Sequence, residues 1–123
     1  MRLPIQYALS YPYRVDLNTE RLDFAALGSL NFEKPDLERF PCLGLAYEAL
    51  RRGGNSTCAM NGANEVAVAA FLRDEIGVTA IPEIISSTME QCSFIGKPDF
   101  EAIFSTDFEA KRLAAEALAK YRK

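Results

Sequence analysis

The hydrophobic and polar positions divide the chain into two parts. From about residue 41 onward, apolar residues recur at intervals of three and four, which places them on one face of a helix. Between about residues 13 and 34 the apolar residues form small clusters without that period. The pattern predicts a C-terminal helical bundle preceded by an arm that has little core of its own.

The first helix of the bundle is predicted to run from Pro41 to Arg51 or Arg52. Proline suits the first turn of a helix, because the amide hydrogen that it lacks would have no partner there. Gly53 and Gly54 follow this segment, and glycine readily adopts the left-handed conformation that ends many helices.

The next helix is predicted from a fully apolar run, Val66 to Leu72. A helix that is apolar on every side belongs at the centre of a domain. Asn61, Asn64 and Glu65 stand just before this run. We expect Asn61 to cap the helix by accepting a hydrogen bond from the amide of residue 64, and the cluster to tie the helix to a neighbouring segment. Contact with a ligand is the open alternative for these three residues.

Two further helices are predicted toward the C-terminus. Thr79 suits the N-cap of the first, since its hydroxyl can accept a hydrogen bond from a free backbone amide. Thr106 and Glu109 have the spacing of a capping box, which predicts that the last helix begins near Asp107. Residues 100–104 are expected to form only a separate helical turn.

The N-terminal arm contains two short predicted elements. Met1 to Ser10 is expected to form a helix that ends at Tyr11-Pro12, because proline disfavours helix at the residue before it. Ser29 to Glu33 alternates polar and apolar residues, which predicts a short strand, although the arm offers no obvious segment to pair with it. The predicted fold class is mainly α: a three- or four-helix bundle after an extended arm with one short strand.

Composition narrows the possible functions. The 123 residues carry a net charge of −3 and are 49% hydrophobic and 25% charged, as in an ordinary soluble globular protein. The acidic balance is atypical of a nucleic-acid-binding domain, and no apolar run is long enough for a membrane span. The opening residues lack the features of a secretory signal, so a cytoplasmic location is expected.

Candidate nucleophiles and ligands are few. The sequence has no histidine, which removes the usual general base and the commonest zinc ligand. Cys42, Cys58 and Cys92 form no closely spaced pair and are expected to be buried, reduced thiols. Cys58 lies near a helix start, where the dipole could lower its pKa, but the chain has no histidine to act as its base.

Residues 53–57 resemble a small anion-binding nest without the lysine of a phosphate loop. These residues alone indicate no self-contained catalytic site.

A set of separate motifs runs through the first part of the chain. They are Met1 to Leu9, Tyr11-Pro12 with Arg14, Leu22 to Phe24, Phe32-Glu33 with Pro35-Asp36, Phe40 to Leu43, Ala46 to Ala49 and Asn61 to Leu72. In this order they resemble the C-terminal third of the 1-deoxy-D-xylulose 5-phosphate reductoisomerases. The resemblance covers residues 1 to about 90 well and the last helix loosely. One departure is Gly62, where alanine is expected and glycine weakens the helix by up to ~1 kcal/mol.

The resemblance implies a part in isoprenoid biosynthesis by the non-mevalonate pathway. This family converts 1-deoxy-D-xylulose 5-phosphate to 2-C-methyl-D-erythritol 4-phosphate with NADPH and a divalent metal, Mg²⁺ or Mn²⁺, and works as a homodimer. By this resemblance, residues 1–14 correspond to the tail of the catalytic domain, residues 15–40 to a connecting arm and residues 41–123 to a C-terminal helical domain.

Of the family's functional residues, the resemblance places only Met1 in this chain, packed near the substrate and the nicotinamide. The metal ligands, the NADPH-binding domain and most substrate-binding residues belong upstream. The chain alone is therefore expected to be inactive and to bind no cofactor or metal, and its partners would be the upstream domains. Two alternatives remain: a free-standing helical protein-interaction module, with exposed arm residues such as Phe24 and Phe32 as its contacts, and a small ligand-binding domain.

Overall fold

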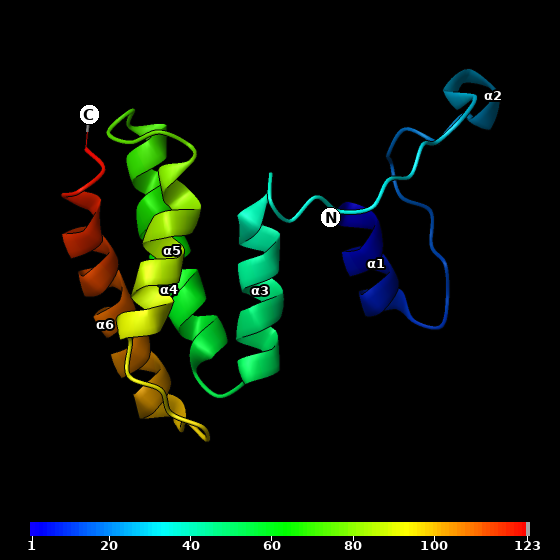
Figure 1. The fold of residues 1–123 in the computed structure, drawn as a ribbon. Coiled ribbons are helices and arrows are strands. Elements are labelled where there is room, and N and C mark those ends of the chain that lie inside the picture. Colours follow the sequence, from blue (N-terminus) through cyan, green and yellow to red (C-terminus); the bar gives the residue numbers. More distant parts are fainter. Residues whose placement is uncertain (123) are drawn as a thin grey trace. The chain divides into compact units, whose positions relative to one another are not determined.

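A computed structural model describes residues 1–122, and all regular secondary structure in this range is helical (Figure 1). The mainly α class predicted from the sequence is confirmed. The chain divides into two compact units, one of residues 1–34 and one that begins at Pro35. The helices are α1 (Arg2–Ser10), α2 (Phe24–Leu27), α3 (Pro41–Arg52), α4 (Ser56–Leu72), α5 (Ala80–Gln91) and α6 (Phe100–Leu118).

The first unit has two short helices and no fully buried side chain. α1 forms where it is predicted and ends before Tyr11, and the side chain of Gln6 donates a hydrogen bond to the carbonyl of Val15. Asp23 caps α2 by accepting hydrogen bonds from the amides of Ala25 and Ala26. α1 and α2 together leave most of their apolar side chains exposed.

The short strand predicted at Ser29–Glu33 is wrong. Within residues 1–122 no residue is in a strand, and these five are irregular. The physical reason is that a strand needs a neighbour to receive its backbone hydrogen bonds, and the first unit supplies none.

The second unit is built around α4. This helix contacts α3, α5 and α6, and α5 contacts α3 and α6, whereas no contact joins α3 to α6 in the described part of the chain (Figure 1). The predicted helix from Pro41 to Arg52 is confirmed with both of its boundaries. α5 follows Thr79 as predicted, but the threonine side chain makes no capping hydrogen bond. None of the helices described here is long and apolar enough to cross a membrane.

The predicted start of the central helix is wrong, because α4 begins at Ser56 and passes through Asn61 without interruption. Asn61 therefore caps nothing; its amide donates to the Glu65 carboxylate at 3.1 Å, one turn further on.

Gly62, in the middle of the helix, lets α6 approach closely. A methyl group there would lie 3.2 Å from the Cβ of Ala110. The close helix contact explains a glycine where helix propensity favours alanine.

The capping box predicted at Thr106 is also wrong. α6 is continuous from Phe100, and Asp99 caps it by accepting a hydrogen bond of 2.8 Å from the amide of Ala102. Thr106 lies inside the helix, where its hydroxyl donates to the Ala102 carbonyl at 2.7 Å. A threonine hydroxyl that is bonded within the helix is unavailable for capping.

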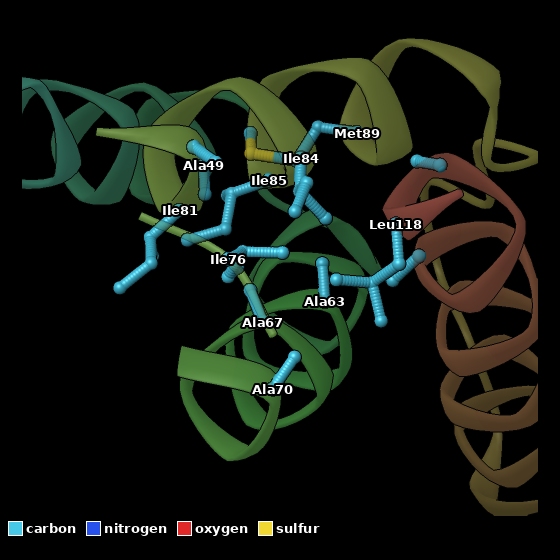
Figure 2. Packing of buried hydrophobic residues seen from close by; sticks show 13 residues of the cluster. Ala49, Ala63, Ala67, Ala70, Ile76, Ile81, Ile84, Ile85, Met89 and Leu118 are labelled. Carbon is cyan, nitrogen blue, oxygen red and sulfur yellow. The ribbon is translucent and has the colours of Figure 1, made fainter. Parts of the chain in front are cut away.

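The core combines small residues of α4 with large residues of α5. Figure 2 shows Ala63 and Ala67 of α4 close to Ile84 and Ile85 of α5, and all four are essentially inaccessible to solvent. Leu118 near the end of α6 completes this cluster. Alanines allow the helices to approach, and the isoleucines fill the remaining space, so each buried isoleucine contributes roughly 2–3 kcal/mol of apolar burial.

Candidate functional site

The segment that resembles an anion nest is filled by the protein's own backbone. Gly54, at a φ of +57°, lies against the carbonyl of Ile95, so close that a side chain would not fit. Asn55 is only 2% exposed. Its amide donates to the Ser93 carbonyl and the Thr106 hydroxyl, and its carbonyl oxygen accepts from the amide of Ile95 at 2.9 Å. These groups satisfy one another, so the Asn55 side chain anchors the loop at Ser93 and Ile95 and is not available to bind a phosphate.

The three cysteines differ in their surroundings. Cys92 is buried as predicted, but Cys58 is half-buried and Cys42 is exposed, so the expectation of three buried thiols is wrong for these two. Burial raises the pKa of the Cys58 thiol, and the nearby Asp107 carboxylate raises it further. The helix dipole is expected to lower this pKa, but desolvation and the carboxylate outweigh it, because both disfavour the charged thiolate. Cys58 is therefore a poor nucleophile.

The Asn61, Asn64 and Glu65 cluster joins α4 to α6. Glu65 pairs with Lys111 at 3.0 Å, and Lys111 also pairs with Asp107 at 2.8 Å. The carboxylates of Asp107 and Glu65 raise the pKa of Lys111. Asn64 is half-buried within α4. The tie to a neighbouring segment that the sequence predicts is thus made by Glu65, and Lys111 is the partner that sequence spacing could not identify.

Met1 lies at the N-cap of α1 and is 93% exposed. It borders a shallow, mainly apolar hollow of about 560 Å³ within the first unit, together with Ile5 and Leu9 of α1 and with Val15 and Leu17 beyond it. The only charged side chain along this hollow is that of Arg2. An apolar hollow of this kind can exclude water from a bound group but offers little to orient one.

A larger groove of about 830 Å³ lies in the second unit, between the beginnings of α3 and α5. Leu45, Val78 and Pro82 are among its apolar lining residues. The carboxylates of Glu38, Glu48 and Glu83, opposed by the single guanidinium of Arg39, also line it. The sequence does not reveal this groove, because its two sides come from separate segments whose lining positions are at least 30 apart in the sequence, as Glu48 and Val78 are.

The residues present do not fit a metal or dinucleotide site. Nowhere in residues 1–122 do three or more histidine, cysteine, aspartate or glutamate side chains converge as a metal would require. The glycines at 53 and 54 follow a helix, whereas the phosphate-binding turn of a dinucleotide domain follows a strand.

The family comparison explains this arrangement. Residues 1–113 match the family described as the DXP reductoisomerase C-terminal domain. The chain belongs to the DXP reductoisomerase family. The match includes α1 through most of α6, so it extends well beyond the segments in which the sequence motifs are strongest.

Full-length reductoisomerases are similar along nearly the whole chain. The 1-deoxy-D-xylulose 5-phosphate reductoisomerase of Bacteroides fragilis is 52% identical over 120 residues, which are 98% of this chain and 31% of that protein. The Aromatoleum aromaticum enzyme is 49% identical over 121 residues, again 98% of this chain and 30% of its own length. The chain thus spans about a third of the reductoisomerases that it matches.

Solved reductoisomerases have the same fold over this region. The Zymomonas mobilis enzyme in complex with NADPH superposes with a TM-score of 0.84 at 42% identity, covering 95% of this chain and 31% of that one. A DOX-P reductoisomerase in complex with NADPH, fosmidomycin and magnesium gives a TM-score of 0.85 at 35% identity, with the same two coverages. NADPH, which the resemblance implies for the family, is thus present in both of these structures, and magnesium is present in the second.

Proposed function

We propose that this chain is the C-terminal portion of an enzyme that converts 1-deoxy-D-xylulose 5-phosphate to 2-C-methyl-D-erythritol 4-phosphate with NADPH and Mg²⁺ or Mn²⁺. The proposal rests on the alignment with the Bacteroides fragilis reductoisomerase, which includes 98% of this chain but only 31% of that enzyme. In this proposal the active enzyme is a cytoplasmic homodimer. The chain by itself is inactive, because the residues that hold NADPH and metal lie in the upstream domains.

In this proposal the chain has three functional parts. Residues 1–14 form the tail of the catalytic domain, residues 15–40 the connecting arm, and residues 41–123 the helical domain that braces the catalytic domain. The exposed apolar surface of the first unit supports this assignment. Leu3, Leu9 and Phe24 are exposed there, and a segment of 34 residues without one buried side chain lacks the core to be stable alone.

Met1 is proposed to touch the substrate and the nicotinamide in the full enzyme. NADPH supplies the hydride for the reduction when it is bound. The contribution of Met1 is an apolar, polarizable side chain at the start of α1, which packs against a ring and excludes water from it. No residue of this chain is assigned a proton transfer.

A domain exchange tests the proposal. The 120 residues of the Bacteroides fragilis enzyme that align with this chain at 52% identity are replaced by this chain, and NADPH oxidation is followed with 1-deoxy-D-xylulose 5-phosphate. We expect an active chimera, an inactive truncation that ends before the exchange point, and no turnover by this chain alone. A folded but inactive chimera would contradict the proposal, as would turnover by the isolated chain.

The groove between α3 and α5 favours a second candidate function. A free-standing helical protein-interaction module would use such an apolar surface for a partner and would need no catalysis. The same exchange separates the two, because a module that has diverged from enzyme function cannot restore NADPH oxidation to the truncated relative.

A further inference from the structure

The hydroxyl group of Ser56, the first residue of α4, is buried without a partner from the protein. Ser56 is 5% exposed, and its Oγ forms no hydrogen bond with any other group in residues 1–122. A hydroxyl can donate one hydrogen bond and accept others, so burying it without any bond is costly. In native proteins a buried polar group of this kind commonly binds an internal water molecule.

Ser56 lines a small cavity inside the second unit, with a volume of about 10 Å³. The cavity lies where the start of α4 meets the end of α5. Its buried lining residues are Asn55, Ser56 and Ala59 at the start of α4, Met89 in the last turn of α5, and Cys92 just after that helix. The unpartnered hydroxyl therefore borders an internal space that is shared by two helices.

The volume of the cavity restricts what it can hold. The centre of one water molecule needs roughly 10–15 Å³, so the cavity is just large enough for a single water and too small for a phosphate or a nucleotide. A cavity that stays dry is lined by apolar groups, whereas this one has the Ser56 hydroxyl in its wall. Size and polarity together select water.

The lining residues also carry acceptors for the hydrogens of a water molecule. The side-chain oxygen of Asn55 accepts a hydrogen bond from the amide of Ile95 at 2.9 Å. The backbone carbonyl of Met89 accepts one from the Arg52 guanidinium at 3.3 Å. Each oxygen has two lone pairs, so each can accept a second hydrogen bond. With the Ser56 hydroxyl they provide the about three polar partners that a buried water typically has.

We propose that one structural water molecule binds in this cavity. It accepts a hydrogen bond from the Ser56 hydroxyl and donates to the carbonyl oxygens of Asn55 and Met89. The water thereby joins the first turn of α4 to the last turn of α5. It also satisfies the hydroxyl, so that Ser56 contributes to the stability of the bundle.

Two exposed residues border the cavity on its solvent side. The guanidinium of Arg52 lies over the ring of Phe94, with its central carbon 4.9 Å from the ring centroid, and both residues line the cavity. The bond from Arg52 to the Met89 carbonyl holds this pair against α5. The pair slows exchange of the water with bulk solvent, so the bound water tumbles with the protein.

Oxygen-17 magnetic relaxation dispersion on the full chain tests the proposal. The method detects water molecules that tumble with a protein, and exchanging hydroxyl hydrogens do not contribute to it. Ser56→Val removes the hydroxyl and fills its space with methyl groups, and we expect this variant to lose the signal of one long-lived water. A high-resolution crystal structure of the unchanged chain should show a water within hydrogen-bonding distance of the Ser56 Oγ.

Thr88→Val is the matched control. Thr88 is 1% exposed and its hydroxyl also has no partner in the described residues, but it does not line this cavity. The control is expected to keep the water that Ser56→Val loses, and circular dichroism verifies that both variants fold. The proposal is overturned by an unchanged signal in folded Ser56→Val, by the same loss in Thr88→Val, or by a crystal structure without a water at the Ser56 Oγ. The crystal structure decides the matter if Ser56→Val does not fold.

Discussion

Asn55, at the turn between α3 and α4, donates a hydrogen bond of 2.9 Å to the hydroxyl of Thr106 in the middle of α6. The same side chain binds the loop at Ser93 and Ile95. One buried amide thus holds two segments whose bonded residues lie 38 to 51 positions after Asn55 in the sequence. Asn55 therefore links α6 and the loop before it to the start of α4.

Asn55→Ala is expected to destabilise the chain by about 2–4 kcal/mol, because it leaves buried donors and acceptors without partners. Urea denaturation followed by circular dichroism measures the change. Asn61→Ala is the matched control: this asparagine is exposed and bonds only Glu65, so a loss below ~0.5 kcal/mol is expected. Equal losses for the two variants would contradict the role given to Asn55.

Two helical glycines should respond differently to alanine. At Gly44 in α3 a methyl group would meet no atom within 4 Å, so Gly44→Ala should stabilise the chain by about 0.5–1 kcal/mol through helix propensity. At Gly62 the methyl group would meet Ala110 at 3.2 Å, on a neighbouring helix that has to move as a whole. Gly62→Ala is therefore expected to gain little, and Gly62→Val to lose about 1–3 kcal/mol. Thermal melts measure both; the same gain at 44 and 62 would argue against the close contact of α4 and α6.

The cysteines should react in the order of their exposure and acidity. Burial, followed by the nearby Glu109 carboxylate, raises the pKa of the Cys92 thiol to about 11. We expect iodoacetamide at mildly alkaline pH to modify Cys42 first and Cys92 last, since the thiolate is the reactive form. Mass spectrometry of peptides over time gives the order. Rapid modification of Cys92 in the folded chain would show that its surroundings are open.

Glu75 should make the stability of the bundle sensitive to acid. The Arg73 guanidinium, with a smaller contribution from Arg122, lowers the pKa of Glu75 below its ordinary value of 4.5. The ionised form is thus favoured in the folded chain, so the stabilisation is complete above pH 4.5 and disappears as the pH falls below that value. Glu75→Gln should lower the melting temperature slightly at neutral pH, and the difference should vanish in acid and shrink in high salt. A difference that persists at low pH would contradict this account.

Limited proteolysis should separate the two units of the isolated chain. Trypsin is expected to cut first at Arg14 and Arg21, in a unit without buried side chains, and only later at Arg73 or Lys111 in the bundle. Mass spectrometry of the early fragments identifies the sites. Early cleavage throughout the bundle, with residues 1–34 protected, would refute the proposal that the first unit needs the upstream domains to be stable.

The helix positions that depend on residues close together in the chain can be predicted from the sequence. Pro41 and the glycines after Arg52 set both ends of α3, and the apolar run to Leu72 identifies the central helix. Asn61 and Thr106 mislead because their types suit caps, whereas each lies inside a longer helix and bonds a residue one turn away in that same helix. The groove, the Asn55 contacts and the Lys111–Glu65 pair join distant segments, and no spacing along one segment encodes them.

The alanine face of α4 has a consequence for divergence within the family. Ala63 and Ala67 leave no room to grow while Ile84 and Ile85 remain opposite them. A larger residue in α4 is tolerated only with a smaller one in α5, because the total core volume is conserved. These two pairs of positions should therefore change together among reductoisomerases, whereas the solvent-facing positions of the same helices should vary independently.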